Sequence, residues 1–112
     1  MILYISGPIT GIVDDNRYAF KTAAARLRNV GYEVINPHDI GAQSGYRNGL
    51  RWSDYLRLDL AAILTEGVTG IATLPGWYKS PGAIFECDVA RKLDLPVGPE
   101  EFWLAIAKGI NQ

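Results

Sequence analysis

Two carboxylates interrupt the apolar faces of two segments that have helical periodicity. Asp59 falls within a stripe of apolar residues that recur every three or four positions between Trp52 and Ile63. Glu86 lies on a helix face of small residues, which would let a ligand come close. Carboxylates that are buried are normally paired, protonated or functional, because burying an unpartnered charge is costly. Asp59 and Glu86 are therefore candidate catalytic residues.

Periodicity alone leaves a structural alternative open for each candidate. Asp59 also fits a helix-face aspartate that caps a neighbouring loop, and Glu86 fits a solvated helix residue. Tyr4 lies in an apolar segment, where a tyrosine usually serves packing but can direct its hydroxyl toward a site at the end of a strand. The sequence pattern does not separate these interpretations.

Three consecutive residues have the pattern of a helix start that can bind an anion. Ser80 supplies an N-cap hydroxyl, Pro81 suits the first helical position, and Gly82 follows with a free backbone N–H. A helix that is merely well capped would show the same pattern. These residues are candidate ligands for a phosphate or another anion.

Two loops offer further candidate ligands. Residues 6–11 are rich in glycine and contribute Ser6, Gly7 and Thr10, although their spacing matches neither a P-loop nor a dinucleotide fingerprint. Gly76 and Trp77 follow a predicted strand, where the indole can stack on a nucleobase or seal a subunit interface. Trp52 and residues 47–51 can line the same site or that of a neighbouring subunit.

Strands and helices must alternate along the chain to position these side chains. Hydrophobic runs and turn residues predict strands at residues 2–6, 32–35, 68–74 and 95–97. The first helix is expected to begin after Asn16, which can cap it, and to end at Gly31. A second helix is expected over residues 54–64, with Ser53 as its cap. Two further helices are expected over residues 81–93 and 100–108.

The alternation predicts one α/β domain over residues 1–112. We expect a three-layer α/β/α, Rossmann-like (flavodoxin-like) fold with a mainly parallel sheet of four or five strands. Pro96 places the last strand at an edge. Ligands of such sheets bind beyond the carboxyl ends of the strands, so the loops after Ile5, Ile35 and Leu74 should form the site, together with a long loop over residues 38–51.

Composition limits the classes of partner. A net charge of −1 gives no excess of positive charge that would attract a nucleic-acid polymer or an anionic membrane surface, so a small molecule is the expected partner. One cysteine, Cys87, and one histidine, His38, exclude a His/Cys metal cluster, and we expect neither a zinc ion nor a cofactor. We expect a cytoplasmic protein, because no signal peptide or membrane segment is evident, and a homodimer or higher homo-oligomer, because aromatic residues are numerous for a short chain.

Four segments together resemble a known family. They are residues 4–11, 52–59, 74–77 and 80–86, and they resemble the DUF4406 family, whose members are small proteins common in bacteria and phages. That family in turn is similar to the nucleoside 2-deoxyribosyltransferases and the deoxynucleoside 5′-monophosphate N-glycosidases. The resemblance extends over residues 1 to about 95.

The resemblance implies roles for individual residues. Glu86 matches a glutamate that attacks the anomeric carbon of the sugar, and Asp59 matches an aspartate that assists at the base. Tyr4 matches a strand tyrosine that donates a hydrogen bond to the nucleophile. Ser80 matches a serine of the nucleotide glycosidases, where enzymes acting on free nucleosides usually carry a carboxylate. Thr10 departs from the pattern, because the nucleotide glycosidases tend to have a basic residue there.

The expected function is cleavage or transfer of the N-glycosidic bond of a (deoxy)nucleoside 5′-monophosphate, through a covalent intermediate on Glu86. A serine and a helix N-terminus favour a 5′-phosphate that a carboxylate would repel, with Arg47, Arg51 or a neighbouring subunit as possible sources of positive charge. Two alternatives are a non-catalytic module that binds or sequesters nucleotides and a phage-type accessory protein that uses exposed Trp52, Trp77 and Trp103 to bind a partner.

Overall fold

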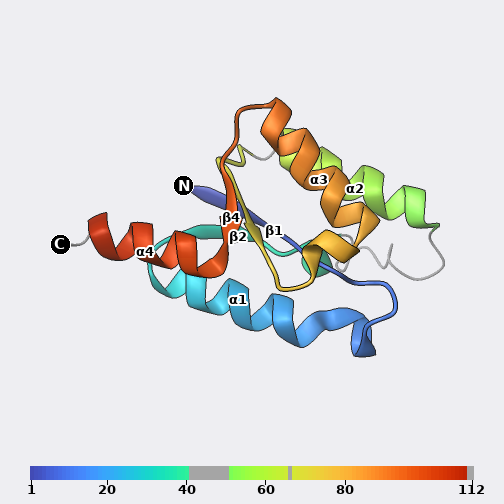
Figure 1. The fold of residues 1–112 in the computed structure, drawn as a ribbon, viewed down its shortest axis with the longest axis horizontal. Coiled ribbons are helices and arrows are strands. Elements are labelled where there is room, and N and C mark those ends of the chain that lie inside the picture. The colour runs from blue at the N-terminus through green and yellow to red at the C-terminus, as the bar shows by residue number, and fades with distance from the viewer. Residues whose placement is uncertain (41–50, 66, 111–112) are drawn as a thin grey trace.

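The computed structural model describes residues 1–40, 51–65 and 67–110. Strands and helices alternate along the chain, as the sequence predicts (Figure 1). The elements are β1 (Ile2–Ser6), α1 (Arg17–Asn29), β2 (Glu33–Ile35), α2 (Trp52–Thr65), β3 (Gly70–Thr73), α3 (Pro81–Lys92), β4 (Val97–Pro99) and α4 (Glu100–Ile110). Short 3-10 turns precede α1 and α3 and follow β2.

The four strands form one parallel sheet in the order β2-β1-β3-β4. Tyr4 of β1 pairs with Ile35 of β2 on one side and with Ile71 of β3 on the other. This is the flavodoxin-like order, in which the chain leaves β1 in opposite directions to reach its two neighbours. The carboxyl ends of β1 and β3 therefore border the crevice in which such folds bind ligands.

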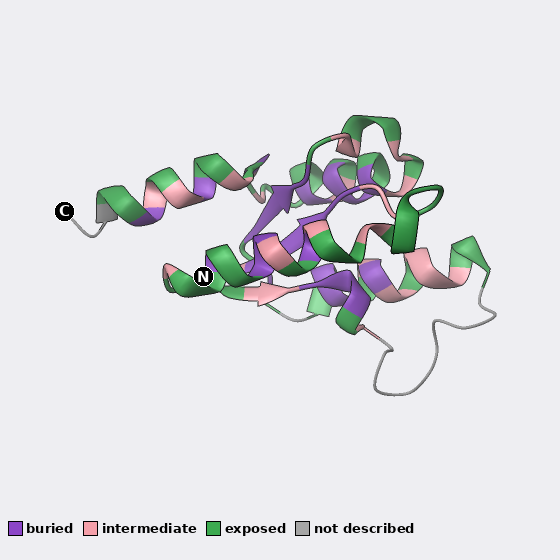
Figure 2. Ribbon diagram, turned by 90° about the horizontal axis from the view of Figure 1, so that it is seen from below, coloured by how far each residue is buried: buried purple, intermediate pink, exposed green. Residues whose placement is uncertain are grey.

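Two helices cover each face of the sheet, which confirms the three-layer α/β/α fold (Figure 1). Alternate side chains of β1 point to opposite layers, as the pleat of a strand requires. Tyr4 belongs to the core beneath α2 and α3, whereas Leu3 and Ile5 belong to the core beneath α1 and α4. Figure 2 shows the buried residues gathered on the strands and on the sides of the helices that face them.

Trp103 anchors α4 to the sheet. Its side chain is only 1% exposed, and its Nε1 donates hydrogen bonds to the carbonyl oxygens of Ile71, at 2.9 Å, and Gly98, at 3.2 Å. Gly70 makes room for the indole, because a Cβ there would lie 2.4 Å from a ring carbon of Trp103. The expectation that Trp103 is exposed for a partner is therefore wrong.

Some local predictions hold, and others need correction. Gly31 follows the end of α1 with a φ of 105°, as a helix-ending glycine does, and β4 lies at the sheet edge, two residues later than expected. Asn16 precedes α1 but does not cap it, since its amide donates to the carbonyl of Pro8 at 2.9 Å. Ser53 is not a cap either, because α2 begins at Trp52.

The structure describes the predicted long loop over residues 38–51 at its two ends, residues 38–40 and residue 51. Residues 41–50, including Arg47, lie outside the described part of the chain. Its first residues form a 3-10 turn, Pro37–Asp39, in which the side chain of Asn36 accepts a hydrogen bond from the backbone N–H of His38 at 3.0 Å. Among the described residues, no helix has the length and apolar character needed to cross a bilayer.

Candidate active site

Glu86 is a buried carboxylate at the carboxyl edge of the sheet. It projects from α3, is 5% exposed, and accepts a hydrogen bond at each carboxylate oxygen. The Tyr4 hydroxyl donates to Oε2 at 2.7 Å, and the Ser6 hydroxyl donates to Oε1 at 2.7 Å. Residues 4 and 6 of a strand point to the same face, so β1 presents both donors to one carboxylate.

These contacts decide between two of the interpretations that the sequence left open. Glu86 is not a solvated helix residue, because α3 packs it against β1. Tyr4 is both a core residue and a directed hydroxyl: its ring lies in the core beneath α2 and α3 while its hydroxyl reaches Glu86. Ser6 contacts Glu86 and is not among the described lining residues, and its contact with a ligand stays a prediction.

A pocket of about 220 Å³ opens beside Glu86 at the carboxyl ends of the strands. It brings together the loop after β1, the turn after β2, the first half of α2 and the first turns of α3. Its lining residues are Gly7, Ile9, Thr10, Asp15, Arg17, His38, Trp52, Tyr55, Leu56, Asp59, Ser80, Gly82, Ala83 and Glu86. The pocket thus lies where the sheet order places a ligand site, and it holds both candidate carboxylates.

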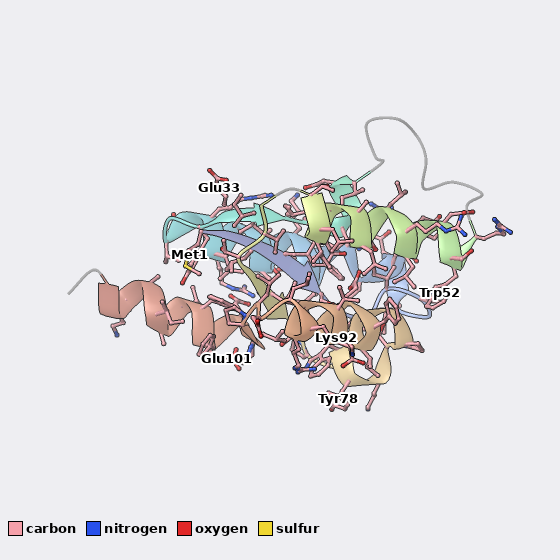
Figure 3. The ribbon with its side chains drawn as sticks, turned by 90° about the horizontal axis from the view of Figure 1, so that it is seen from above. Met1, Glu33, Trp52, Tyr78, Lys92 and Glu101 are labelled. Carbon is pink, nitrogen blue, oxygen red and sulfur yellow. The ribbon has the colours of Figure 1, made fainter. Side chains whose placement is uncertain are left out.

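Asp59 enters the pocket from α2 and is 6% exposed. The helical stripe predicted from the sequence therefore does turn this carboxylate inward, beside the buried Ala62 and Ile63 of the same helix. Trp52, Tyr55 and Leu56 line the pocket from the first turns of α2. Figure 3 shows Trp52 at the start of α2, on the side where α3 begins. The pocket accordingly combines an apolar wall with the carboxyl groups of Asp15, Asp59 and Glu86.

The start of α3 has the capped geometry that the sequence predicts. The Ser80 hydroxyl oxygen accepts from the backbone N–H of Ala83 at 3.3 Å, and Pro81 occupies the first turn. Ser80 and Gly82 both line the pocket. A Cβ at Gly82 would lie 3.7 Å from Nε1 of Trp52, an ordinary van der Waals contact, so sterics do not require glycine there. Because the Ser80 oxygen acts as an acceptor in this cap, its hydroxyl proton can donate a hydrogen bond to a ligand.

The loop after β1 is held close to β3 and to the start of α1. A Cβ at Gly7 would lie 2.8 Å from Cβ of Leu74, so only glycine fits there without a shift. The hydrogen bond from Asn16 to Pro8 ties the start of α1 to this loop. Thr10 lines the pocket from the exposed part of the loop. The predicted ligand residues Gly7 and Thr10 are therefore at the pocket.

Gly76 and Trp77 lie elsewhere among the described residues and are absent from the described lining. Gly76 has a φ of 82° and begins the 3-10 turn Trp77–Lys79. Trp77 packs against the core beneath α2 and α3, and the guanidinium of Arg91 lies 5.7 Å from the centre of its ring. A contact of either residue with a ligand stays a prediction. The aromatic residues at the pocket are Trp52 and Tyr55.

Three pocket residues with charged or imidazole side chains were missed by sequence reasoning, besides the less polar Ile9, Tyr55, Leu56 and Ala83. His38 is buried and meets the ring of Phe20 edge-on, with ring centres 4.8 Å apart. Its place directly after the second strand was a usable signal, because loops at that edge carry ligand residues. Asp15 and Arg17 reach the pocket because the chain turns sharply before α1, with φ values of 53°, 53° and 61° at residues 14–16. No sequence pattern announces such a turn.

Cys87 lies behind the site and is fully buried. Burial raises the pKa of its thiol to about 11, while a hydrogen bond with Ser6 opposes that shift. The thiol is therefore protonated at neutral pH and lies beside a hydroxyl that contacts Glu86. Within the described parts of the chain, no group of three or more His, Cys, Asp or Glu side chains is placed to hold a metal ion.

Comparison with known families assigns the chain to one of them. The model of DUF4406, a domain of unknown function, matches residues 1–98. The chain belongs to the DUF4406 family. The match includes strands β1 to β3, helices α1 to α3 and the first two residues of β4, and hence all the described pocket residues of this DUF4406 protein, whereas α4 lies beyond it. A search of curated proteins found no significant match. An account of function must therefore rest on the chemistry of the site.

Proposed function

We propose that this DUF4406 protein cleaves or transfers the N-glycosidic bond of a (deoxy)nucleoside 5′-monophosphate, with Glu86 as the nucleophile. The observation that carries the proposal is the pair of 2.7 Å hydrogen bonds that hold Glu86 in place at a pocket shared with a second carboxylate. A fixed carboxylate opposite a second acid or base is the arrangement that glycosyl transfer through a covalent intermediate requires.

In the first step, a carboxylate oxygen of Glu86 attacks C1′ of the sugar. The bond between C1′ and the base nitrogen breaks, and its electron pair leaves with the base, which takes a proton from Asp59 or through it. In the second step, water or the nitrogen of another base attacks C1′, the ester bond to Glu86 breaks, and the incoming group gives up its proton. Asp59 can accept that proton, so both carboxylates return to their starting forms.

The two hydrogen bonds orient Glu86 without blocking it. Each carboxylate oxygen has two lone-pair positions, and the contacts with Tyr4 and Ser6 use one on each oxygen. A nucleophile held in one rotamer loses less entropy on reaching the transition state than a mobile one. Tyr4 and Ser6 are thus positioning residues in this proposal.

The composition of the pocket supports a nucleotide as the substrate. An apolar wall with Trp52 and Tyr55 suits the flat face of a base, whereas Ser80 and the N-terminus of α3 suit an anion. The resemblance to the nucleotide N-glycosidases points to the same substrate class, because they carry a serine at the position of Ser80. The reaction calls for no metal or redox cofactor.

The test is release of free base from a panel of deoxynucleosides and their 5′-monophosphates, followed by liquid chromatography. We expect the wild type to release base from monophosphates and Glu86→Gln and Glu86→Ala to lose at least about 1,000-fold of that rate, since a covalent step has no substitute. Glu101→Gln, an exposed glutamate on α4, is the matched control and should retain full activity.

Two results would contradict the enzyme proposal. If nucleotides bind but none loses its base, with or without an acceptor base, the protein is a binding or sequestering module, and Glu86→Gln should then leave binding intact. If no nucleotide binds at all, the pocket serves another ligand, or the exposed Trp52 serves a protein partner.

A further inference from the structure

The described pocket lining holds three carboxylates and one permanent cation. Asp15, Asp59 and Glu86 supply carboxyl groups, and Arg17 is the only Lys or Arg among the described lining residues. A 5′-phosphate brings up to two further negative charges into this pocket. Hydroxyls and backbone N–H groups can bind phosphate oxygens, but in so acidic a pocket a cation is needed to offset the repulsion.

Arg17 is placed at the pocket by an unusual piece of backbone. It is the first residue of α1, and the three residues before it all have left-handed φ values of 53° to 61°. Left-handed conformations are unfavourable for residues other than glycine, although Asp and Asn adopt them more readily than most, and a run of three still needs surroundings that hold it. The hydrogen bond from Asn16 to the carbonyl of Pro8 is one such restraint. The turn thereby directs the start of α1 toward the loop that lines the pocket.

Arg17 has a partner that a phosphate can replace. Its Nε lies 3.8 Å from Oδ1 of Asp14, and the two side chains are 50% and 77% exposed. Exposed pairs of this length contribute little stability, because water screens them and no short hydrogen bond is formed. A guanidinium offers five donors in a planar fork, which fits two oxygens of a phosphate better than this single distant carboxylate oxygen.

We propose that Arg17 is the residue that selects a 5′-phosphorylated substrate, by exchanging its contact with Asp14 for the phosphate, with Ser80 and Thr10 as neutral partners. This inference rests on the proposed nucleotide substrate and adds the residue that discriminates nucleotide from nucleoside. It also accounts for a first loop that has Thr10 and no basic residue, since the positive charge comes from seven residues further along the chain.

The first experiment compares kcat/KM for matched pairs of deoxynucleoside and deoxynucleoside 5′-monophosphate. Arg17→Gln should lower kcat/KM for the monophosphate by about 10- to 100-fold, the usual effect of losing a charge-assisted phosphate contact, and should leave the nucleoside within about twofold. Arg17→Lys should restore part of the loss. The matched control is Lys21→Gln, one turn further along α1, which lines an outer groove but not the pocket and should change neither substrate.

A second experiment measures binding without turnover, by calorimetry in the Glu86→Ala background with the same nucleosides, monophosphates and inorganic phosphate. Asp14→Asn should tighten monophosphate binding, since it removes the competing carboxylate, whereas Arg17→Gln should weaken it by about 10-fold or more. If monophosphates bind through Arg17 but are never cleaved, the proposed reaction fails and this inference stands. If monophosphates are cleaved and Arg17→Gln leaves the preference unchanged, this inference is overturned and the proposed reaction stands. If no monophosphate binds, both fail.

Discussion

The Glu86 carboxylate joins two secondary-structure elements through two short hydrogen bonds. Tyr4 and Ser6 of β1 each contact a different oxygen of this α3 side chain. A buried carboxylate depends on such donors, because losing one leaves a charged oxygen without compensation. The same contacts that orient a nucleophile therefore also hold α3 against the sheet.

A double-mutant cycle on stability should reveal the coupling between Tyr4 and Glu86. Tyr4→Phe alone is expected to lower the free energy of unfolding by about 1–3 kcal/mol, because it removes a hydrogen bond from a buried carboxylate oxygen. In a Glu86→Leu background the same change should cost much less, since no charge then needs the hydroxyl. Urea denaturation of the four proteins measures the difference. Equal costs in the two backgrounds would contradict the contact.

Cys87 should behave as an inert buried thiol. Burial raises its pKa to about 11, above its value in the unfolded chain. The stabilisation linked to this group is fully present below the unfolded pKa and is lost as the pH rises toward 11. We expect slow reaction with a thiol reagent at pH 8 in the native protein and fast reaction in urea. We also expect the free energy of unfolding to fall less between pH 9 and 11 in Cys87→Ala than in the wild type.

Sequence reasoning located the two carboxylates but not their surroundings. A helical stripe that contains Asp59 and a small-residue face that contains Glu86 are visible in the one-dimensional pattern. The contact of Ser6 with Glu86 spans 80 positions, and it follows only from the packing of α3 on β1. Arg17 and Asp15 escaped notice because their position depends on a turn of left-handed residues.

The N-terminus of α3 combines a structural cap with a pocket wall. Ser80 caps the helix through Ala83, and the free N–H groups that follow carry the positive end of the helix dipole. An anion in the pocket would meet this end of the helix. One residue therefore has both a folding role and a proposed binding role, and the two can be separated by substitution.

Ser80→Asp should separate them, because aspartate is as good an N-cap as serine but carries a negative charge. We expect the melting temperature to stay within about 2 °C of the wild type, while kcat/KM for monophosphates falls about 10-fold or more and that for nucleosides is unchanged or rises. Ser80→Ala is the complementary variant, which should lower stability by about 1 kcal/mol. A monophosphate preference that survives Ser80→Asp would argue against a phosphate at this helix.

The start of a helix was predictable where one side chain could cap it, and not where several polar side chains could serve as the cap. Ser80 with Pro81 fixed the start of α3 correctly. For α2, Ser53 was the expected cap, yet the helix begins one residue earlier, where Asp54 reaches back to the backbone N–H of Arg51 at 3.2 Å. For α1, the Asn16 amide is used to bind Pro8 and not the helix. Side chains with several available partners are assigned by tertiary structure.

At the scale of the molecule, α4 completes the core although it lies beyond the family match. Trp103→Phe is expected to lower the free energy of unfolding by about 1–3 kcal/mol, because it removes two hydrogen bonds and leaves a void against Gly70. The control is Trp52→Phe at a 54% exposed position, which should change stability by less than about 0.5 kcal/mol. Urea denaturation measures both, and equal effects would contradict the anchoring role of Trp103.

Homo-oligomerisation stays a prediction, and the exposed apolar side chains on α3 are a candidate contact surface for it. Ile84 and Phe85 are 39% and 47% exposed and are adjacent in sequence. We expect sedimentation to give at least twice the mass of one chain, and Phe85→Lys to weaken this association, because a charge would be buried in an apolar contact. A monomeric wild type at micromolar concentration would contradict the prediction.

The fold was more predictable than the site, for a physical reason. The order of strands and helices follows from hydrophobic period and turn residues, which are local, and it determines the parallel three-layer arrangement almost by itself. Trp103 shows the limit, because an aromatic in a terminal helix has the same pattern whether it fills the core or faces a partner. Long-range packing determines that Trp103 is buried, as it determines the hydrogen-bond partners of Glu86.

The three left-handed residues before α1 have a consequence for how this protein would respond to selection for heat resistance. Glycine adopts such angles without steric cost, so replacing Asp14 or Asp15 by glycine should relieve up to about 1 kcal/mol of local strain at each position, whereas Asn16→Gly would also lose the hydrogen bond to Pro8. Selection for stability at high temperature alone should therefore favour glycine substitutions in this turn. The selected variants would hold the start of α1 less firmly, so they would gain thermal stability and lose the proposed selectivity for 5′-monophosphates.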